Sequence, residues 1–370
     1  MSARSGHPRG AWRRAASWPV AAQWGALVAL SALISAIWGA AGLPAALLLG
    51  PMIGGIVLGV NGVRLAVPRL PYLGAQAVIG AMVSAAITPD IVSIFLHDAV
   101  LFSVVLGVTL LGAAALGWSI SRFGLIPGAT AVYGITPGAA GPMMLLGEAE
   151  GADVHLVAFM QYSRVLLVVL AAAFVARFWA GAADLHPRGA LWLTPVHWGN
   201  LVTVLLLAAL AQQTARLLRL PAWAVLGPVL LLSAMHATGW LTIELPRWML
   251  AGAYAVIGWQ IGLGFRRDAL LQIGRALPVV MGATLLLMAL CALLAWCLAR
   301  FAHVDSLTAY LATSPGGIDS VAIIAASTPR VDLSFVLALQ SVRLLFVIGL
   351  APLITRLVVR HSPHLQELRH

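Results

Sequence analysis

The stretch TSPGGIDS, residues Thr313 to Ser320, interrupts an otherwise apolar segment with a proline, two glycines and a carboxylate. Proline removes a backbone donor and glycine loosens a helix, so the segment does not continue as a plain helical span. A break of this kind is stable at membrane depth only where protein groups or a wet cavity satisfy the freed backbone. The first question is therefore whether the chain lies in a membrane, and the second is what the break does there.

The composition indicates a membrane protein along nearly the whole chain. Of the 370 residues, 61% are hydrophobic and only 9% are charged, which is too little charge to keep a soluble protein in solution. Apolar runs of about 18 residues or more recur from Trp18 to Leu357, and each can cross the hydrocarbon layer as a helix. We predict an all-α polytopic membrane protein.

The positive charge is arranged for membrane topology. The formal net charge is +10, and all 22 basic residues are arginines that lie mostly singly or in pairs at the ends of apolar runs. This placement sets orientation in a bilayer and does not build a nucleic-acid surface, so we expect no nucleic-acid partner. The basic N-terminus runs directly into an apolar segment without a clear cleavage site. We expect a multi-pass protein of the bacterial inner membrane with both termini in the cytoplasm.

The chain contains an internal duplication. In order along the chain, LPAALLLGP (Leu43–Pro51) recurs as LPAWAVLGP (Leu220–Pro228), AQAVIG (Ala75–Gly80) as AYAVIG (Ala253–Gly258), and TAVYGITPG (Thr130–Gly138) as TAYLATSPG (Thr308–Gly316). Chance does not keep this order with nearly constant spacing, so we divide the chain into membrane repeats at residues 1–187 and 188–370. The break after Thr313 therefore has a counterpart in the first repeat, TPGAAGP, which begins at Thr136.

Two topologies are compatible with this duplication. Each repeat has six apolar segments, and the broken segment is the fifth of them. If that segment enters the membrane and returns, each repeat has five crossings plus a re-entrant hairpin, and the second repeat is inverted. If it crosses, the repeats are parallel with six crossings each. The distribution of arginines barely separates the two, but paired broken segments are typical of inverted-repeat transporters, so we favour inversion.

One arginine lies deep in the long apolar segment that follows each break. These are Arg164 and Arg343, and a glutamine three residues earlier, Gln161 or Gln340, shares the helix face of each. A buried charge at that depth is costly, which points to a role. Two interpretations are open: the arginines cap carbonyls that the breaks free, or they provide the counter-charge for a bound anion.

The second interpretation predicts a binding site at the two breaks. Its predicted substrate-binding residues are Thr136, Pro137, Gly138, Gln161, Arg164, Thr313, Ser314, Gly316, Gly317, Gln340 and Arg343. The acid after the second break, Asp319, corresponds to Gly141 in the first repeat. It is either a coupling group for a proton or sodium ion, or an ion-pair partner of one of the two arginines.

Enzyme chemistry has little support in the sequence. It contains no HxxxH, HExxH or paired-carboxylate spacing and no nucleotide-binding loop, and Cys291 and Cys297 offer neither a disulfide nor a metal motif. We therefore expect no catalytic residues, no metal and no cofactor, and transport that is not driven by ATP through this chain.

With the duplication and the two breaks in view, the chain resembles the Gram-negative AbrB family of integral membrane proteins. The resemblance rests on the doubled pattern LGP, AVIG, TPG (SPG in the second repeat) and Q-x-x-R, and it covers nearly the whole chain. It implies a secondary transporter for a small polar metabolite, with an elevator-like mechanism as one possibility. Members have been labelled transcriptional regulators or ammonia monooxygenases, and the residues here support neither label.

Three hypotheses about function follow. The first is a secondary transporter of a small organic acid anion, driven by a proton or sodium gradient. The second is a membrane-embedded ligand sensor or regulator that binds without moving its ligand. The third, a membrane enzyme, predicts clustered histidines or carboxylates, which the sequence lacks. The identity of the substrate, the direction of transport and the oligomeric state are not encoded in any motif that we recognise.

Overall fold

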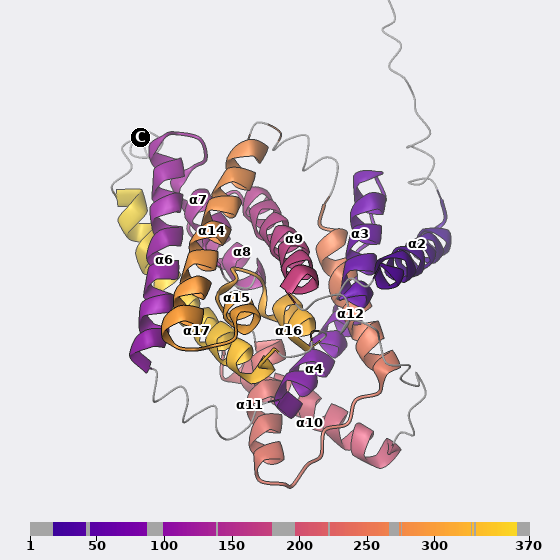
Figure 1. The fold of residues 1–370 in the computed structure, drawn as a ribbon. Helices are drawn as coiled ribbons and strands as arrows, with labels where there is room; N and C mark the ends of the chain where they lie inside the picture. Colours follow the sequence, from indigo (N-terminus) through magenta and orange to yellow (C-terminus); the bar gives the residue numbers. More distant parts are fainter. Residues whose placement is uncertain are drawn as a thin grey trace, which may run out of the picture.

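The fold is described from a computed structural model of the chain. The residues described are 18–41, 45–86, 99–137, 140–179, 197–220, 223–265, 274, 276–326, 328 and 331–360. All regular structure within these residues is helical, with no strand (Figure 1). The prediction of an all-α protein is confirmed.

The two halves of the chain contribute helices in the same order. The first half contributes α2 (Val20–Ala40), α3 (Ala46–Val60), α4 (Arg69–Ala86), α6 (Ala99–Arg122), α7 (Gly128–Ile135), α8 (Ala140–Ala149) and α9 (Val154–Trp179). The second contributes α10 (Trp198–Leu217), α11 (Trp223–Ala237), α12 (Arg247–Gly262), α14 (Leu277–Phe301), α15 (Ser306–Thr313), α16 (Ile318–Ala326) and α17 (Leu333–Arg360). The motifs that recur in the sequence lie on corresponding helices of the two series.

Several helices are long and apolar enough to cross a bilayer. Within the described residues, five qualify by length and composition, and they belong to α2, α6, α9, α10 and α14. Helix α2 faces outward most clearly, since only 17% of its most apolar window is buried and Val20, Leu33 and Ile37 are exposed. Apolar side chains that point outward fit a lipid environment. The chain is a multi-pass membrane protein.

Each predicted break separates two short helices. Helix α7 ends at Ile135 and α8 begins at Ala140, while α15 ends at Thr313 and α16 begins at Ile318. The N-terminus of α15 is capped by Asp305, whose carboxylate accepts hydrogen bonds from the backbone N–H groups of the first turn. The proline-glycine sequences therefore end one half-helix and start another, as the sequence predicts.

Each pair of short helices folds back on itself. The backbone N–H of Asp153, just before α9, donates to Thr130 Oγ1 near the start of α7 at 3.0 Å. The equivalent bond in the second half joins Asp332 N–H to Thr308 Oγ1 at 3.1 Å. The broken segment thus returns to the end of the bundle from which it started, which is the geometry of a re-entrant hairpin. The orientation of the repeats in the membrane stays a prediction.

Contacts between the two halves are reciprocal. Helices α3 and α4 of the first half correspond to α11 and α12 of the second. Helix α3 packs on α12, and the equivalent contact joins α11 to α4. Helix α6 also packs on its counterpart α14. In Figure 1, α6 leads into α7 at the top of the molecule and α14 leads into α15 near the bottom, so α6 and α14 run in opposite directions. Reciprocal contacts of this kind are what a two-fold relation between the repeats produces.

Glycines permit the closest of these reciprocal contacts. A Cβ on Gly80 of α4 would lie 2.8 Å from Pro228 Cβ of α11, and a Cβ on Gly258 of α12 would lie 3.0 Å from Pro51 Cβ of α3. The last residue of each AVIG motif therefore packs on the proline of the LGP motif from the other half. This packing explains why both motifs recur in the sequence.

We predict opposite effects for alanine at two glycines of α12. Gly252→Ala should raise stability slightly, by up to about 1 kcal/mol, because alanine is the better helix former and nothing lies near a Cβ there. Gly258→Ala should lower it by about 1–3 kcal/mol, because its Cβ would lie 2.6 Å from the Leu48 carbonyl oxygen and separate α3 from α12. Unfolding in mixed micelles measures both, and equal effects would show that this contact is not tight.

Topology is testable by accessibility labelling. In a background with Cys291 and Cys297 replaced by alanine, we predict that Phe123→Cys and Glu148→Cys label from the same side of the membrane, because the hairpin between them returns. Phe301→Cys, the counterpart of Phe123 in the second repeat, should label from the opposite side. All three native side chains are exposed. Labelling of positions 123 and 301 from the same side would contradict inverted repeats.

Candidate functional site

The first break is closed by two side chains from α9. Gln161 and Arg164 are buried, with 0% and 1% of their surface exposed. Gln161 Nε2 donates to the carbonyls of Tyr133 (2.7 Å) and Thr136 (3.1 Å). Arg164 Nη1 donates to the carbonyls of Thr136 (2.9 Å) and Ile135 (3.3 Å), and its Nη2 donates to Gln161 Oε1 at 2.7 Å. Apart from Gln161 Oε1, the acceptors are backbone carbonyls at the end of α7.

The second break repeats this arrangement with α17. Gln340 Nε2 donates to the carbonyls of Leu311 (2.9 Å) and Ser314 (3.1 Å). Arg343 Nη1 donates to the Ser314 carbonyl at 2.6 Å, and Nη2 donates to the Gly316 carbonyl at 3.0 Å. Arg343 Nη2 also donates to Gln340 Oε1. Both side chains are buried, with 1% and 4% exposed.

These bonds satisfy the carbonyls that each break frees. The last four carbonyls of a helix have no intrahelical partner, and the C-terminal end carries a partial negative charge. A guanidinium with a neighbouring amide supplies several donors and a compensating positive charge at that end. In transporters with broken helices, such ends commonly coordinate a cation. Here a cation tethered to the next long helix occupies that position.

The capping interpretation of the two arginines is therefore observed directly. Their predicted role in substrate binding, and that of Gln161 and Gln340, stays a prediction, because capping uses some donors without removing the net charge. The hydrogen-bond partners found for Arg343 are all neutral: backbone carbonyls and the amide oxygen of Gln340. Within the described residues, the dipoles of these neutral acceptors stabilise the positive charge of the guanidinium in the protein interior.

The hydroxyl groups near the breaks bond within their own half-helices. Thr136 Oγ1 donates to the Val132 carbonyl at 2.6 Å, and Ser314 Oγ donates to the Leu311 carbonyl at 2.9 Å. Thr313 Oγ1 is 2.9 Å from the Ala309 carbonyl and 3.0 Å from the Cys291 carbonyl of α14. In this conformation the three hydroxyls can accept a hydrogen bond from a ligand but direct their own protons to the backbone. Their substrate-binding role stays a prediction.

The second break lies against the helix that carries Arg164. A Cβ on Gly316 would lie 3.0 Å from Val168 Cγ1, and a Cβ on Gly317 would lie 3.8 Å from Val165 Cγ2. Both valines belong to α9. The break contributed by the second repeat therefore packs within one turn of the arginine contributed by the first, so the predicted residues of the two repeats form one cluster.

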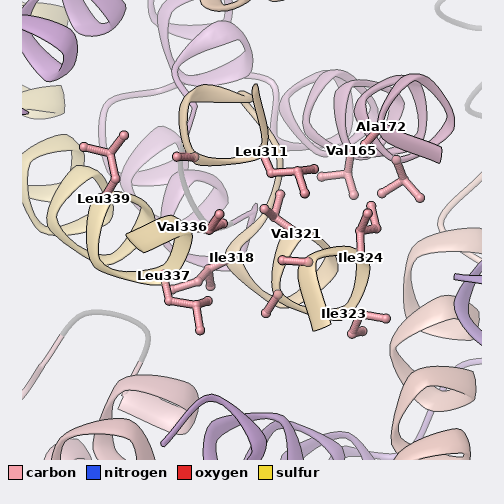
Figure 2. Close-up of a cluster of buried hydrophobic side chains, with 14 of the residues drawn as sticks. Val165, Ala172, Leu311, Ile318, Val321, Ile323, Ile324, Val336, Leu337 and Leu339 are labelled. Carbon is pink, nitrogen blue, oxygen red and sulfur yellow. The ribbon is translucent and has the colours of Figure 1, made fainter. Parts of the chain in front are cut away.

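The surroundings of this cluster are apolar. Figure 2 shows side chains from α9, α15, α16 and α17 packed together, among them Val165, Leu311, Val321 and Val336. Arg343 donates to the Gly316 carbonyl, and Gly316 packs on α9 about one turn from Arg164, so the two guanidinium groups belong to one cluster. Two like charges in one apolar neighbourhood repel each other more strongly than they would in water.

The remaining predicted site residues are only partly accounted for. Pro137 is buried and lies two residues after the end of α7. Gly138 lies outside the described residues. The backbone of Asp319 lies in the first turn of α16, but its side chain is outside the described part, so its coupling role stays a prediction.

Sequence reasoning missed three residues, Cys291, Thr130 and Thr308. The backbone carbonyl of Cys291 accepts a hydrogen bond from Thr313, a role that does not depend on the thiol. Thr130 and Thr308 fasten the start of each hairpin to the next long helix. The signal was present, since both threonines begin the repeated segments that contain the breaks. Within the described residues, no group of three or more histidines, cysteines, aspartates and glutamates is placed to hold a metal.

The fold and this cluster define a class: an all-helical multi-pass membrane protein with two broken, capped helices that fold back on themselves. Comparison with known proteins identifies the family. The family model described as "Transition state regulatory protein AbrB" matches residues 47–359. The chain is 43% identical over 342 residues to the "Putative regulator AbrB" of Escherichia coli (strain K12), covering 92% of this chain and 98% of the relative. It belongs to the AbrB family.

A second relative is more distant. The "Uncharacterized protein YhjN" of Bacillus subtilis (strain 168) is 28% identical over 300 residues, covering 76% of this chain and 77% of the relative. The resemblance drawn from the doubled motifs is confirmed at the level of the family.

We predict that removal of the Arg343 side chain destabilises the second hairpin. Arg343→Ala leaves buried carbonyls without donors, each worth about 1–3 kcal/mol, so the unfolding midpoint should fall markedly. Millimolar guanidinium ion should restore part of the loss in the variant and leave the wild type unchanged, because the free ion can occupy the vacated position. Arg343→Lys should give an intermediate loss, since lysine keeps the charge but not the fork.

The matched control is Arg300→Ala, because Arg300 is an exposed arginine at the end of α14. It should change the midpoint little and show no response to guanidinium. If Arg343→Ala unfolds at the wild-type temperature, the carbonyls at the break do not depend on Arg343.

Proposed function

We propose that this protein is a secondary transporter of a small organic acid anion, coupled to a proton or sodium gradient across the bacterial inner membrane. The observation that carries the proposal is the pair of buried guanidinium groups, one from each repeat, held close together at two broken helices. Two buried guanidinium groups cost more desolvation energy than neutral donors that could cap the same carbonyls, so the use of arginine at both breaks favours a role beyond capping.

The electrostatics favour an anionic substrate. Among the described residues, the acceptors of Arg343 are all neutral. Arg164 adds a second positive charge to the same apolar cluster. The N-terminus of α16 adds backbone N–H groups that have no intrahelical partner and carry a partial positive charge. A carboxylate bound beside them would be stabilised by both guanidiniums and by these donors. This supports the predicted site at Gly316, Gly317 and the two arginines.

The capping geometry also bears on coupling. Cations in broken-helix transporters bind at the carbonyl ends of half-helices, but here Arg164 and Arg343 occupy those ends. The coupling ion therefore acts elsewhere, and Asp319, in the first turn of α16, is the group that we propose for it. Protonation or sodium binding at Asp319 would cancel a negative charge next to the site and so change its affinity for an anion.

Alternating access fits the reciprocal architecture. The returning hairpins and the opposed directions of α6 and α14 support inverted repeats, which exchange conformations to open a central site to either side. An elevator-type movement of the hairpin-bearing helices against α3, α4, α11 and α12 is the form of this exchange that we propose. We further propose that the protein has no catalytic activity.

The alternative is a membrane-embedded sensor that binds the same anion without moving it. It is favoured by the name of the Escherichia coli relative, "Putative regulator AbrB". The two functions share a binding site and differ in turnover, so they are separated by whether substrate crosses the bilayer.

Counterflow in proteoliposomes with a panel of labelled small organic acids tests the proposal. We expect the purified protein to exchange at least one of these anions, and a sensor to exchange none while still being stabilised by it. Asp319→Asn should retain counterflow, which needs no driving ion, but lose accumulation driven by a proton or sodium gradient. Normal accumulation by Asp319→Asn would remove Asp319 from coupling, and absence of exchange across the panel would favour the sensor.

A further inference from the structure

A cavity remote from the broken helices lies where α2 begins. It has a volume of about 580 Å³ and is lined by Val20, Gln23, Trp24, Gly62, Arg64, Leu65 and Ala66. These residues come from the first turns of α2 and from the loop that follows α3. The cavity opens beside a helix whose apolar side chains point outward, so it borders the lipid-facing surface.

The walls of the cavity are held in place. Gln23 is only 8% exposed, and its Nε2 donates to the Trp18 carbonyl at 2.9 Å. Trp24 packs edge-on against Trp259 of α12, with ring centroids 5.8 Å apart, and Trp259 Nε1 donates to Ser31 Oγ at 3.0 Å. These contacts anchor the base of the cavity to the packed helices of both repeats.

The chemistry of the lining suits an anionic head group with an apolar tail. The exposed guanidinium of Arg64 is the charged group among the lining residues, and none of them is acidic. The first turn of α2 contains no acid, and this end of the helix carries a partial positive charge. Val20, Leu65 and Ala66 provide apolar surface, and tryptophan is favoured at the boundary between lipid and water.

The corresponding place in the second repeat is built differently. There Asn200, in the first turn of α10, donates through Nδ2 to the Thr242 carbonyl at 2.8 Å. His197 Nδ1 lies 3.3 Å from Glu244 Oε2. The helix start and the loop after α11 are thus tied together by polar side chains, and the loop carries an acid where the first repeat has Arg64 in its loop. The difference is local, because the glycine that ends the preceding helix has positive φ in both repeats, 86° at Gly62 and 75° at Gly239.

We propose that the Arg64 cavity is a binding site for the head group of an anionic phospholipid, with the phosphate at Arg64 and an acyl chain along the exposed face of α2. A bilayer lipid rather than a soluble phosphate is favoured by the continuity of the cavity with the outward apolar side chains of α2. The site is separate from the proposed anion-transport site, and its test does not depend on transport.

The experiment compares thermal unfolding of the full-length protein in nanodiscs of phosphatidylcholine with and without phosphatidylglycerol. We expect phosphatidylglycerol to raise the unfolding midpoint of the wild type. Arg64→Gln should weaken retention of phosphatidylglycerol roughly fivefold, as measured by native mass spectrometry, because one arginine near an anionic lipid surface contributes about that factor. Arg69→Gln is the charge-matched control, since Arg69 is exposed nearby and does not line the cavity.

A second variant tests the cavity itself. Ala66→Trp occupies part of the cavity without changing charge and should also weaken retention of phosphatidylglycerol, whereas Arg69→Gln should not. If Arg64→Gln and Arg69→Gln lose phosphatidylglycerol equally, the lipid is attracted by the general surface charge and the proposed site is wrong. If Ala66→Trp retains phosphatidylglycerol as the wild type does, the lipid does not use the cavity. If millimolar inorganic phosphate in phosphatidylcholine nanodiscs reproduces the stabilisation and Arg64→Gln abolishes it, the ligand is soluble phosphate and the lipid proposal fails.

Discussion

The structure depends on the capping of two interrupted helices by arginine and glutamine side chains from the helices that follow. A half-helix that ends inside a bilayer leaves carbonyl groups without water, at a cost of several kcal/mol for each unsatisfied group. Arg343 and Gln340 supply donors to the end of α15, and Arg164 and Gln161 supply them to the end of α7. Without these donors the carbonyls at the breaks would be buried and unsatisfied, and the broken helices would be unstable. Capping therefore accounts for the position of the only cluster of buried charge in the described residues.

Around the broken helices, the scaffold is held by close backbone packing rather than by polar bonds. Lipid chains are as apolar as leucine, so helices associate in a membrane through tight packing and a few hydrogen bonds. Gly80 beside Pro228 and Gly258 beside Pro51 bring α4 to α11 and α12 to α3. The proline inside α11 is also compensated, because Gln212 Nε2 donates at 2.7 Å to the Ala224 carbonyl, which Pro228 leaves without its helical donor.

The repeats are equivalent in architecture and unequal in chemistry. Both breaks are capped in the same way, but an acid follows only the second, where Asp319 replaces Gly141. At the outer ends of the scaffold, Arg64 lines an open cavity in the first repeat, while His197 and Glu244 pair in the second. The two repeats share the same arrangement of helices, and single residue differences between them place different charges at equivalent positions.

The sequence by itself determined the membrane class, the duplication, the positions of both breaks and the identity of the arginines and glutamines that matter, because composition and repetition are properties of the chain alone. It left open whether Arg164 and Arg343 cap carbonyls, because donors and acceptors are 28 or more residues apart in the pairs Arg164–Thr136 and Arg343–Ser314. It also gave no sign that Gly317 packs near Arg164, or that Arg64 lines a cavity. Those facts depend on which helices lie side by side, and only tertiary packing decides that.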